Sequence, residues 1–153
     1  MSVHKKGKYE KKSFESMGNS SDTSANIYES MMTSPAWLSL KARPQILYVT
    51  CKSQYYSEKK KPNGNNLQFT MNKHKWCNKY KLYSNANSQA FYNDMAELIE
   101  KGFIICIECG AITRTKSIYQ LCDGWRLYGT EKFSPPPFSS YTLGMLNKTR
   151  NKE

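Results

Sequence analysis

The chain lacks the residue combinations on which several enzyme classes depend. Its 153 residues include only two histidines, His4 and His74, which are far apart in sequence. A nicking initiator of the His-x-His kind needs two histidines close together on a strand to hold its metal, and that pair is missing. No Gly-rich loop of the Walker type is present, so ATP-driven unwinding is not supported. No Ser-His-Asp or Cys-His arrangement can be assembled either. We therefore expect no catalysis and no cofactor.

Long apolar runs are also missing. No stretch approaches the ~18 consecutive apolar residues that a membrane span requires. The first residues lack the apolar region of a secretory signal peptide. The five cysteines are an odd number in a chain without an export signal, which favours reduced thiols. From these features we expect a cytoplasmic protein that does not enter a membrane.

A second pair of closely spaced cysteines is missing as well. Cys106 and Cys109 in "FIICIECG" have the spacing of half a zinc ribbon, but a structural zinc site usually needs two such pairs. A set of Cys106, Cys109, His74 and Cys77 would require the strand to meet the helix predicted over "MNKHKWCNKYK". A strand in which cysteine serves as a small buried apolar residue needs no such meeting. We favour the strand, expect no metal, and keep a zinc-stabilised domain as an alternative.

The charge of the chain is strongly positive and unevenly distributed. A formal net charge of +11 favours a polyanionic partner, most often nucleic acid and less often an acidic membrane surface. Residues 34–81 contain ten Lys or Arg residues and a single acid, Glu58. Residues 82–103 contain more acids than bases. A basic segment followed by a partly acidic one differs from a uniformly basic surface.

The order of local patterns defines one domain between two tails. Residues 1–33 are polar without a sustained period, which predicts a flexible basic arm. "SPAWLSL" and "ARPQILYVTCKSQYY" predict two helices, the first with Ser34 as N-cap and a proline at its first position. "SEKKKPNGNN" is a loop and "NLQFT" a short strand. After the folded part at 34–132, "FSPPPF" and the basic end predict a loose tail at 133–153.

Two further helices and a hairpin complete the pattern. Thr70 can cap a helix over "MNKHKWCNKYK", and "LYSN" then supplies a turn. The next helix is predicted from about Asn85 to Lys101 and should end at Gly102, which suits a left-handed C-terminal position. Its buried stripe comprises Phe91, Met95, Leu98 and Ile99. "FIICIEC" and "SIYQLC" flank "GAITRTK", which predicts two strands joined as a hairpin.

This order of elements predicts an α+β winged helix-turn-helix fold. The stretches "SPAWLSL…ARPQILYVTCKSQY", "SQAFYNDMAELIEKGFI" and "SIYQLCDGW" resemble the winged helix-turn-helix proteins of Gram-positive plasmids, phages and integrative elements. The resemblance covers about residues 34–132, and "LIEKGFI" is its most specific part. It implies a DNA-binding protein that controls transcription or initiates replication of a mobile element. The cysteines of the hairpin depart from the general pattern.

The helix at 85–101 is the expected reader of DNA bases. With its apolar stripe inward, the face turned outward and the leading end carry amides and small apolar side chains. Amides of Asn and Gln can pair with adenine, and an alanine methyl can contact the methyl of thymine. We therefore predict base contacts, favouring A·T pairs, by Asn85, Ala86, Gln89, Asn93 and Ala96.

Basic residues on either side of that helix are the expected phosphate contacts. Four lysines fall on the preceding predicted helix or its turn, a region that crosses the sugar-phosphate backbone in this architecture. Two more cations lie at the tip of the hairpin, from where a wing reaches the minor groove or a flanking phosphate. The predicted backbone contacts are Lys73, Lys75, Lys79, Lys81, Arg114 and Lys116. In the alternative interpretation the four lysines at 73–81 only keep the protein soluble.

A partner other than double-stranded DNA also fits part of the pattern. Winged helices can bind proteins through the same faces, and the acids Asp94, Glu97 and Glu100 are compatible with a protein-interaction module. The many aromatic residues could stack on single strands, but most fall at core positions. No heptad pattern indicates a coiled-coil dimer, and a homodimer stays open as an alternative.

Overall fold

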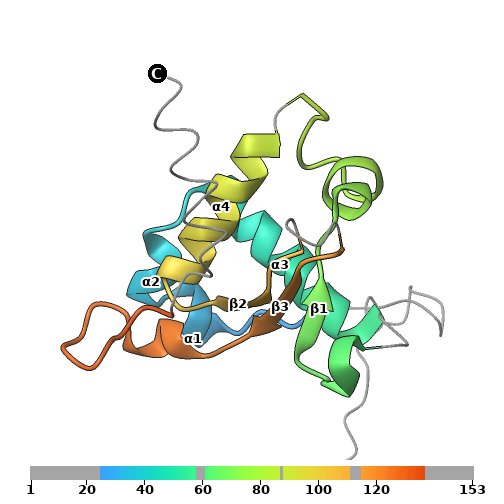
Figure 1. The fold of residues 1–153 in the computed structure, drawn as a ribbon. Helices are drawn as coiled ribbons and strands as arrows, with labels where there is room; N and C mark the ends of the chain where they lie inside the picture. The colour runs from blue at the N-terminus through green and yellow to red at the C-terminus, as the bar shows by residue number, and fades with distance from the viewer. Residues whose placement is uncertain (1–24, 58–60, 87, 111–114, 137–153) are drawn as a thin grey trace, which may run out of the picture.

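The computed structural model describes residues 25–57, 61–86, 88–110 and 115–136, which form a mixed α+β fold (Figure 1). Most of the helical segments and all of the described strands are short. In order these elements are α1 (Glu29–Met32), α2 (Pro35–Leu38), α3 (Ala42–Ser57), the 3-10 turn η2 (Pro62–Gly64), β1 (Gln68–Thr70), the π-helix η3 (His74–Lys79), α4 (Ser88–Glu100), β2 (Ile104–Glu108), β3 (Ile118–Leu121) and the 3-10 turn η4 (Gly124–Leu127).

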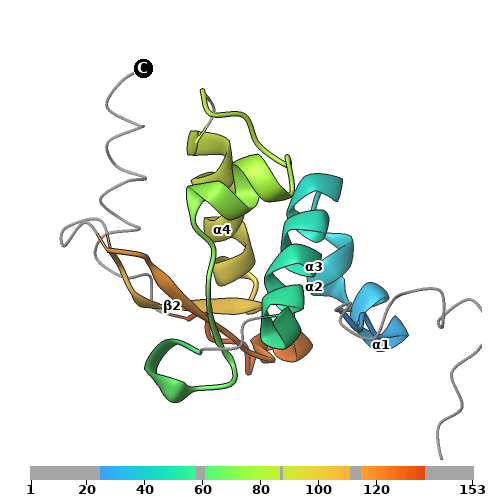
Figure 2. The same ribbon diagram turned by 90° about the vertical axis from the view of Figure 1, so that its right-hand side faces the viewer.

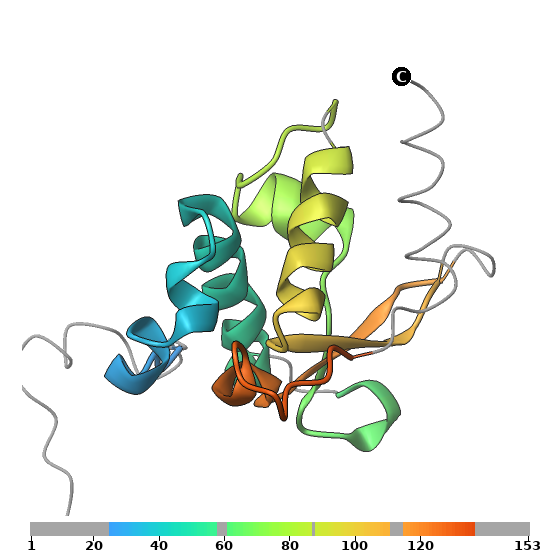
Figure 3. The same ribbon diagram turned by 90° about the vertical axis from the view of Figure 1, so that its left-hand side faces the viewer.

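The three described strands form one antiparallel sheet in the order β1-β3-β2. Tyr119 at the centre of β3 pairs with Phe69 on β1 and with Cys106 on β2. The register shifts between Cys106 and Glu108, so β2 carries an irregularity near its end. The predicted strand in "NLQFT" and the two predicted hairpin strands are confirmed. Helices α3 and α4 lie on one side of this sheet (Figures 2 and 3).

The beginning of the fold corrects the predicted boundary at Ser34. Ser34 is the N-cap of α2, as predicted: its hydroxyl accepts from the backbone N–H of Trp37 at 3.2 Å, and Pro35 occupies the first helical position. Helix α1, however, lies inside the range 1–33 predicted as a flexible arm, and Met31 is 2% exposed in the core. A four-residue helix is too short to produce a period in the sequence. Residues 1–24 and 137–153 of the two predicted tails lie outside the described residues.

Helix α4 packs as the periodicity predicts. Phe91, Met95, Leu98 and Ile99 are all buried. Gly102 has φ +84°, and the backbone N–H of Phe103 donates to the carbonyl of Leu98 at 3.0 Å, which closes the helix at the predicted residue. The start was predicted too early, because α4 begins at Ser88 and not near Asn85.

The helix before α4 differs from the prediction in type and in cap. Residues 74–79 are π-helical, with the N–H of Tyr80 bonded to the carbonyl of Lys75 at 2.9 Å. Thr70 does not cap this segment: Lys73 precedes its first residue and makes no side-chain capping bond, while the Oδ1 of Asn72 accepts from the N–H of Lys75 at 3.1 Å. Thr70 instead ends β1. Apolar spacing alone does not separate a single π turn from an α-helix, so the sequence could not reveal it.

Several ionisable side chains are neutral parts of the core. Burial raises the pKa of Tyr48, Tyr83 and Tyr119 above the ordinary value of 10.0, and it raises the pKa of the Cys51 thiol above 9.0. In the unfolded chain these groups ionise at their ordinary values, whereas in the folded chain they keep their protons. The stabilisation that these neutral groups give to the folded state is complete at pH values below their ordinary pKa. It is lost progressively as the pH rises above that value.

We therefore expect alkaline pH to destabilise the protein steeply. At pH values above its ordinary pKa, which is 9.0 for the Cys51 thiol and 10.0 for the tyrosines, each such group lowers the free energy of unfolding by about 1.4 kcal/mol per pH unit. Urea unfolding under reducing conditions at about pH 8 and about pH 10.5 measures this slope. Tyr48→Phe should make the dependence shallower, because it removes one of the groups. An equal free energy of unfolding at both pH values would contradict the prediction.

Candidate nucleic-acid interface

The exposed flank of α4 carries an amide pair. Asn93 is exposed and Gln89 is half-buried one turn earlier. The Gln89 Nε2 donates to the Asn93 Oδ1 at 2.9 Å. Phe91 and Leu98 lie on the opposite, buried flank of the same helix. The orientation predicted for these four residues therefore agrees with the structure, apart from the partial burial of Gln89.

The outward position predicted for Ala96 is wrong. Ala96 is 4% exposed, and Ala90 and Asp94 are buried as well. Helix α4 contacts α3 and β2, and the ring of Phe91 stacks on Trp76 of η3 at 4.7 Å. Because three elements pack against α4, its buried arc is wider than the four-residue apolar stripe indicates. Ala96 falls at the edge of this arc and cannot contact a base in this arrangement.

Asn85 and Ala86 are exposed but do not belong to α4. They form a turn before the first residue of the helix, Ser88. The Cys77 Sγ donates to the Asn85 Oδ1 at 3.4 Å, which links this turn to η3. Both residues therefore stay near the leading end of α4, where they were predicted, but on a connection and not on the helix face.

The amide pair has the chemistry needed to recognise adenine. A bidentate contact with adenine requires one acceptor and one donor on the same amide. The Asn93 Oδ1 has two lone pairs, and only one is used by Gln89. The contact from Gln89 restrains the rotation of the Asn93 side chain and leaves its Nδ2 available as a donor. Gln89 thus acts as a support for Asn93 in this geometry.

The predicted phosphate contacts of η3 fall into two groups. Lys73, Lys79 and Lys81 are exposed. Lys81 has φ +51°, so it turns the chain directly after η3, and the Lys79 ammonium lies 5.1 Å from the ring centre of Tyr80. The stacking of Trp76 on Phe91 holds η3 beside the first turns of α4 (Figure 2). Three exposed lysines therefore accompany the leading end of the helix that carries Asn93.

Lys75 has a structural partner that the sequence did not indicate. Its ammonium donates to the backbone carbonyl of Thr70 at 2.8 Å and to the Thr70 hydroxyl at 3.0 Å. Lys75 is half-buried, and its bonds join η3 to the end of β1. A phosphate would have to compete with these two contacts, so we remove Lys75 from the expected interface.

The hairpin is described only in part. Lys116 is exposed just before β3. Arg114, the other cation predicted at the tip, lies outside the described residues, as does the rest of 111–114. The backbone N–H of Gly110 donates to the Ser117 hydroxyl at 3.1 Å, so the two arms are bonded at this point. Lys116 is thus placed at the far end of the hairpin from α4.

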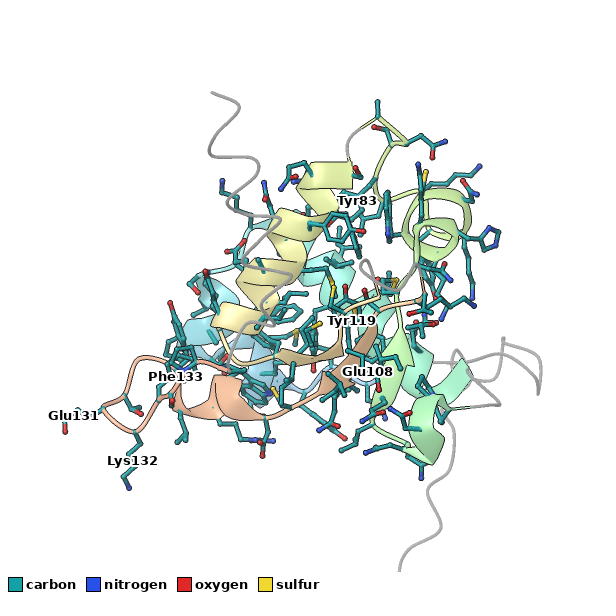
Figure 4. The ribbon with its side chains drawn as sticks, viewed as in Figure 1. Tyr83, Glu108, Tyr119, Glu131, Lys132 and Phe133 are labelled. Atoms are coloured by element: carbon teal, nitrogen blue, oxygen red, sulfur yellow. The ribbon has the colours of Figure 1, made fainter. Side chains whose placement is uncertain are left out.

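The acidic residues of α4 are largely engaged within the fold. Asp94 is buried: its Oδ2 accepts from the Arg43 Nε at 2.6 Å and from the Tyr83 hydroxyl at 2.5 Å. Glu97 pairs with Lys101 at 2.8 Å, which leaves Glu100 exposed. Tyr83, labelled in Figure 4, lies beside the leading half of α4. The group was not predicted from the sequence, although position 94 lies on the same buried side of the helix as Phe91 and Leu98.

The cysteines do not assemble into a metal site in the described part of the chain. All five are free, and no group of three or more His, Cys, Asp or Glu residues there could hold a metal ion. The set Cys106, Cys109, His74 and Cys77 that a zinc site would need is therefore not brought together. Cys106 is buried on the inner face of β2, as expected for a small apolar residue.

Comparisons with protein-family models, with curated proteins and with solved structures find no match to this chain. Within the described ranges, no helix combines the length and the apolar character needed to cross a membrane.

Proposed function

We propose that the chain is a non-catalytic winged-helix protein of the cytoplasm that binds double-stranded DNA. The order α3, β1, η3, α4, β2, β3, with strands arranged as β1-β3-β2, is compatible with a winged helix-turn-helix and supports this proposal. In this assignment η3 and α4 are the helix-turn-helix, and β2 with β3 forms the wing. The sequence resemblance extends the proposal to transcription control or replication initiation of a mobile element.

In the proposed mechanism, α4 recognises bases and the neighbouring η3 contacts phosphates. Helix α4 enters the major groove with its exposed flank, and Asn93, supported by Gln89, recognises adenine. The exposed lysines on and around η3 contact phosphates and fix the position of α4 along the duplex. Lys116 at the wing contacts a flanking phosphate. With a formal net charge of +11, the chain attracts DNA before these contacts form.

One observation carries the proposal. Helix α4 is buried through Phe91 and Leu98 while the bonded amides of Gln89 and Asn93 face outward beside a lysine-bearing π-helix. The competing proposal of a protein-interaction module depended on three acids of α4. Asp94 is buried and Glu97 is paired with a lysine, so only Glu100 stays exposed. The observed surface therefore favours a polyanionic partner over a basic protein.

Two substitutions should separate the two kinds of contact. We expect Asn93→Ala to reduce discrimination at one base pair by about 1–3 kcal/mol, and to change affinity for random DNA little. We expect Lys79→Met to weaken binding to all sequences and to lower the slope of log K against log[salt] by about 0.9. The measurement is the equilibrium affinity for a site enriched from a random duplex library, taken at several salt concentrations.

Lys132→Met is the matched control for Lys79→Met. Lys132 is also exposed, but it lies on the loop after η4, well away from η3 (Figure 4). This variant should keep the parent salt slope, apart from a small loss due to net charge. If Lys79→Met and Lys132→Met have the same effect, or if the enriched site loses nothing in Asn93→Ala, the proposed interface is wrong. Repeating the enrichment with a chelator tests the zinc alternative separately.

A further inference from the structure

A cavity of about 480 Å³ lies on a part of the molecule that the proposed DNA interface does not use. Its lining residues come from α1, α3, β3, η4 and the chain segments beside them, and none comes from η3 or α4. Small-molecule sites commonly have volumes of about 300–1,000 Å³. The lining includes the apolar side chains of Met31, Leu67, Leu121 and Trp125.

Two of the residues that line this cavity are large apolar side chains exposed to water. Tyr28 is 57% exposed and Leu67 is 46% exposed. They come from segments far apart in the sequence, Tyr28 from the residue before α1 and Leu67 from the residue before β1. An apolar molecule in the cavity would remove both side chains from water, and this burial favours binding.

The charged residues of the lining are mainly cationic. Lys52 and Arg126 line the cavity together with a single acid, Asp123. The Lys52 ammonium lies 4.9 Å from the ring centre of Tyr28, and the Arg126 guanidinium lies 4.5 Å from the Trp125 ring. Partial burial lowers the pKa of Lys52, because the charged form loses part of its solvation there. An anion beside Lys52 would compensate for this lost solvation.

We propose that this cavity binds a small amphipathic carboxylate. The apolar part of the ligand packs on Met31, Leu121 and Trp125, and its carboxylate contacts the Lys52 ammonium and the Arg126 guanidinium. A neutral molecule of the same shape gains the apolar contacts only. The proposal concerns binding itself and does not depend on the proposed DNA function.

Trp125 connects the cavity to the C-terminal end of α4. The Trp125 ring lies parallel to Phe103, with ring centres 6.2 Å apart, and its backbone N–H donates to the carbonyl of Gly102 at 3.0 Å. Gly102 and Phe103 directly follow α4. A ligand on Trp125 therefore contacts the group that holds the C-terminal end of α4. An effect on DNA affinity would rest on the proposed function, so it is kept out of the first test.

The test compares decanoate with decanol, which has the same chain length and no charge. Binding to the full chain is followed by amide NMR shifts, at ligand concentrations below those at which either compound aggregates. We expect saturable shifts at Leu121, Cys122 and Trp125, and a preference for decanoate of about tenfold. Lys52→Met should reduce this preference, because only Arg126 then contacts the carboxylate. Lys79→Met, at a residue that does not line the cavity, should retain it.

Each result has a defined consequence. Shifts at the cavity residues, with a preference that is reduced in Lys52→Met and retained in Lys79→Met, support the proposal. Equal binding of decanoate and decanol, an unchanged preference in Lys52→Met, or shifts spread over unrelated residues would each overturn it. A thermal unfolding curve of Lys52→Met, matched to that of the parent, shows that lost binding is not lost folding. Because DNA is absent, none of these outcomes depends on whether the chain binds a duplex.

Discussion

Gly102→Ala is expected to lower the free energy of unfolding by about 3 kcal/mol or more. Gly102 has φ +84°, a region that a residue with a Cβ adopts only at a cost. The added Cβ would also lie 2.6 Å from the carbonyl carbon of Gly124 and 2.7 Å from the backbone nitrogen of Trp125. Both atoms belong to the backbone, so rotation of a side chain cannot relieve the contact.

The substitution should also disturb the packing of η4 against the end of α4. The Trp125 N–H donates to the Gly102 carbonyl at 3.0 Å, and moving η4 away to accommodate a methyl would lengthen this bond. Trp125 also packs against Phe103 in the core. Since small domains are stable by only about 5–15 kcal/mol, the expected loss is a large share of the total. The measurement is urea unfolding followed by tryptophan fluorescence.

Gly64→Ala is the matched control. Gly64 also has a positive φ, +65°, but no heavy atom lies within 4 Å of its ideal Cβ position. This substitution should therefore cost about 1 kcal/mol, the price of the backbone conformation alone. Equal losses in the two variants would show that the close approach of Gly124 does not contribute. A loss below about 1 kcal/mol in Gly102→Ala would contradict the packing of η4 against the end of α4.

The parts of the fold that the sequence predicted are those controlled by local chemistry. Ser34 followed by proline defines the start of α2, and Gly102 defines the end of α4. The stripe of Phe91, Met95, Leu98 and Ile99 gives the buried side of α4. Each of these signals depends on residues close together in the sequence, so it can be recognised without knowing which other elements pack nearby.

The parts that the sequence did not predict depend on neighbours that are distant along the chain. Ala96 is buried because α3, β2 and η3 all surround α4, and a four-residue stripe does not reveal how many elements will do so. Lys75 is bonded to Thr70 because the last residue of β1 lies beside η3. An exposed and an internally bonded lysine look the same in sequence. Only the packing of the folded chain therefore distinguishes the predicted interface residues that are free to contact DNA from those that are not.

The pairing of Asp94 with Arg43 and Tyr83 is the clearest long-range feature of the site. Arg43 and Asp94 are 51 residues apart, and their contact joins α3 to α4. The guanidinium also lies 5.1 Å from the Tyr83 ring centre. The hydrogen bond with Asp94 raises the pKa of Arg43, and burial together with that hydrogen bond raises the pKa of Tyr83. The buried carboxylate thus fixes three segments around the leading half of α4.

Asp94→Ala is expected to lower the free energy of unfolding by about 2–3 kcal/mol. Most of this loss comes from the Tyr83 hydroxyl, which is left buried without its acceptor, because Tyr83 is only 6% exposed. Arg43 contributes less, since its side chain is 48% exposed and can return to water. The higher helix propensity of alanine offsets about 0.5 kcal/mol. Urea unfolding of the variant and its parent measures the difference.

A double-mutant cycle with Tyr83→Phe assigns the effect to the proposed bond. Once the Tyr83 hydroxyl is gone, Asp94→Ala should cost at least about 1 kcal/mol less than it does in the parent. Glu100→Ala, at an exposed position of the same helix, should stay within about 0.5 kcal/mol of the parent. Additive losses in the cycle would mean that Asp94 stabilises α4 through contacts other than Tyr83. If Asp94→Ala were as mild as Glu100→Ala, the buried pairing would have no part in holding α4 in place.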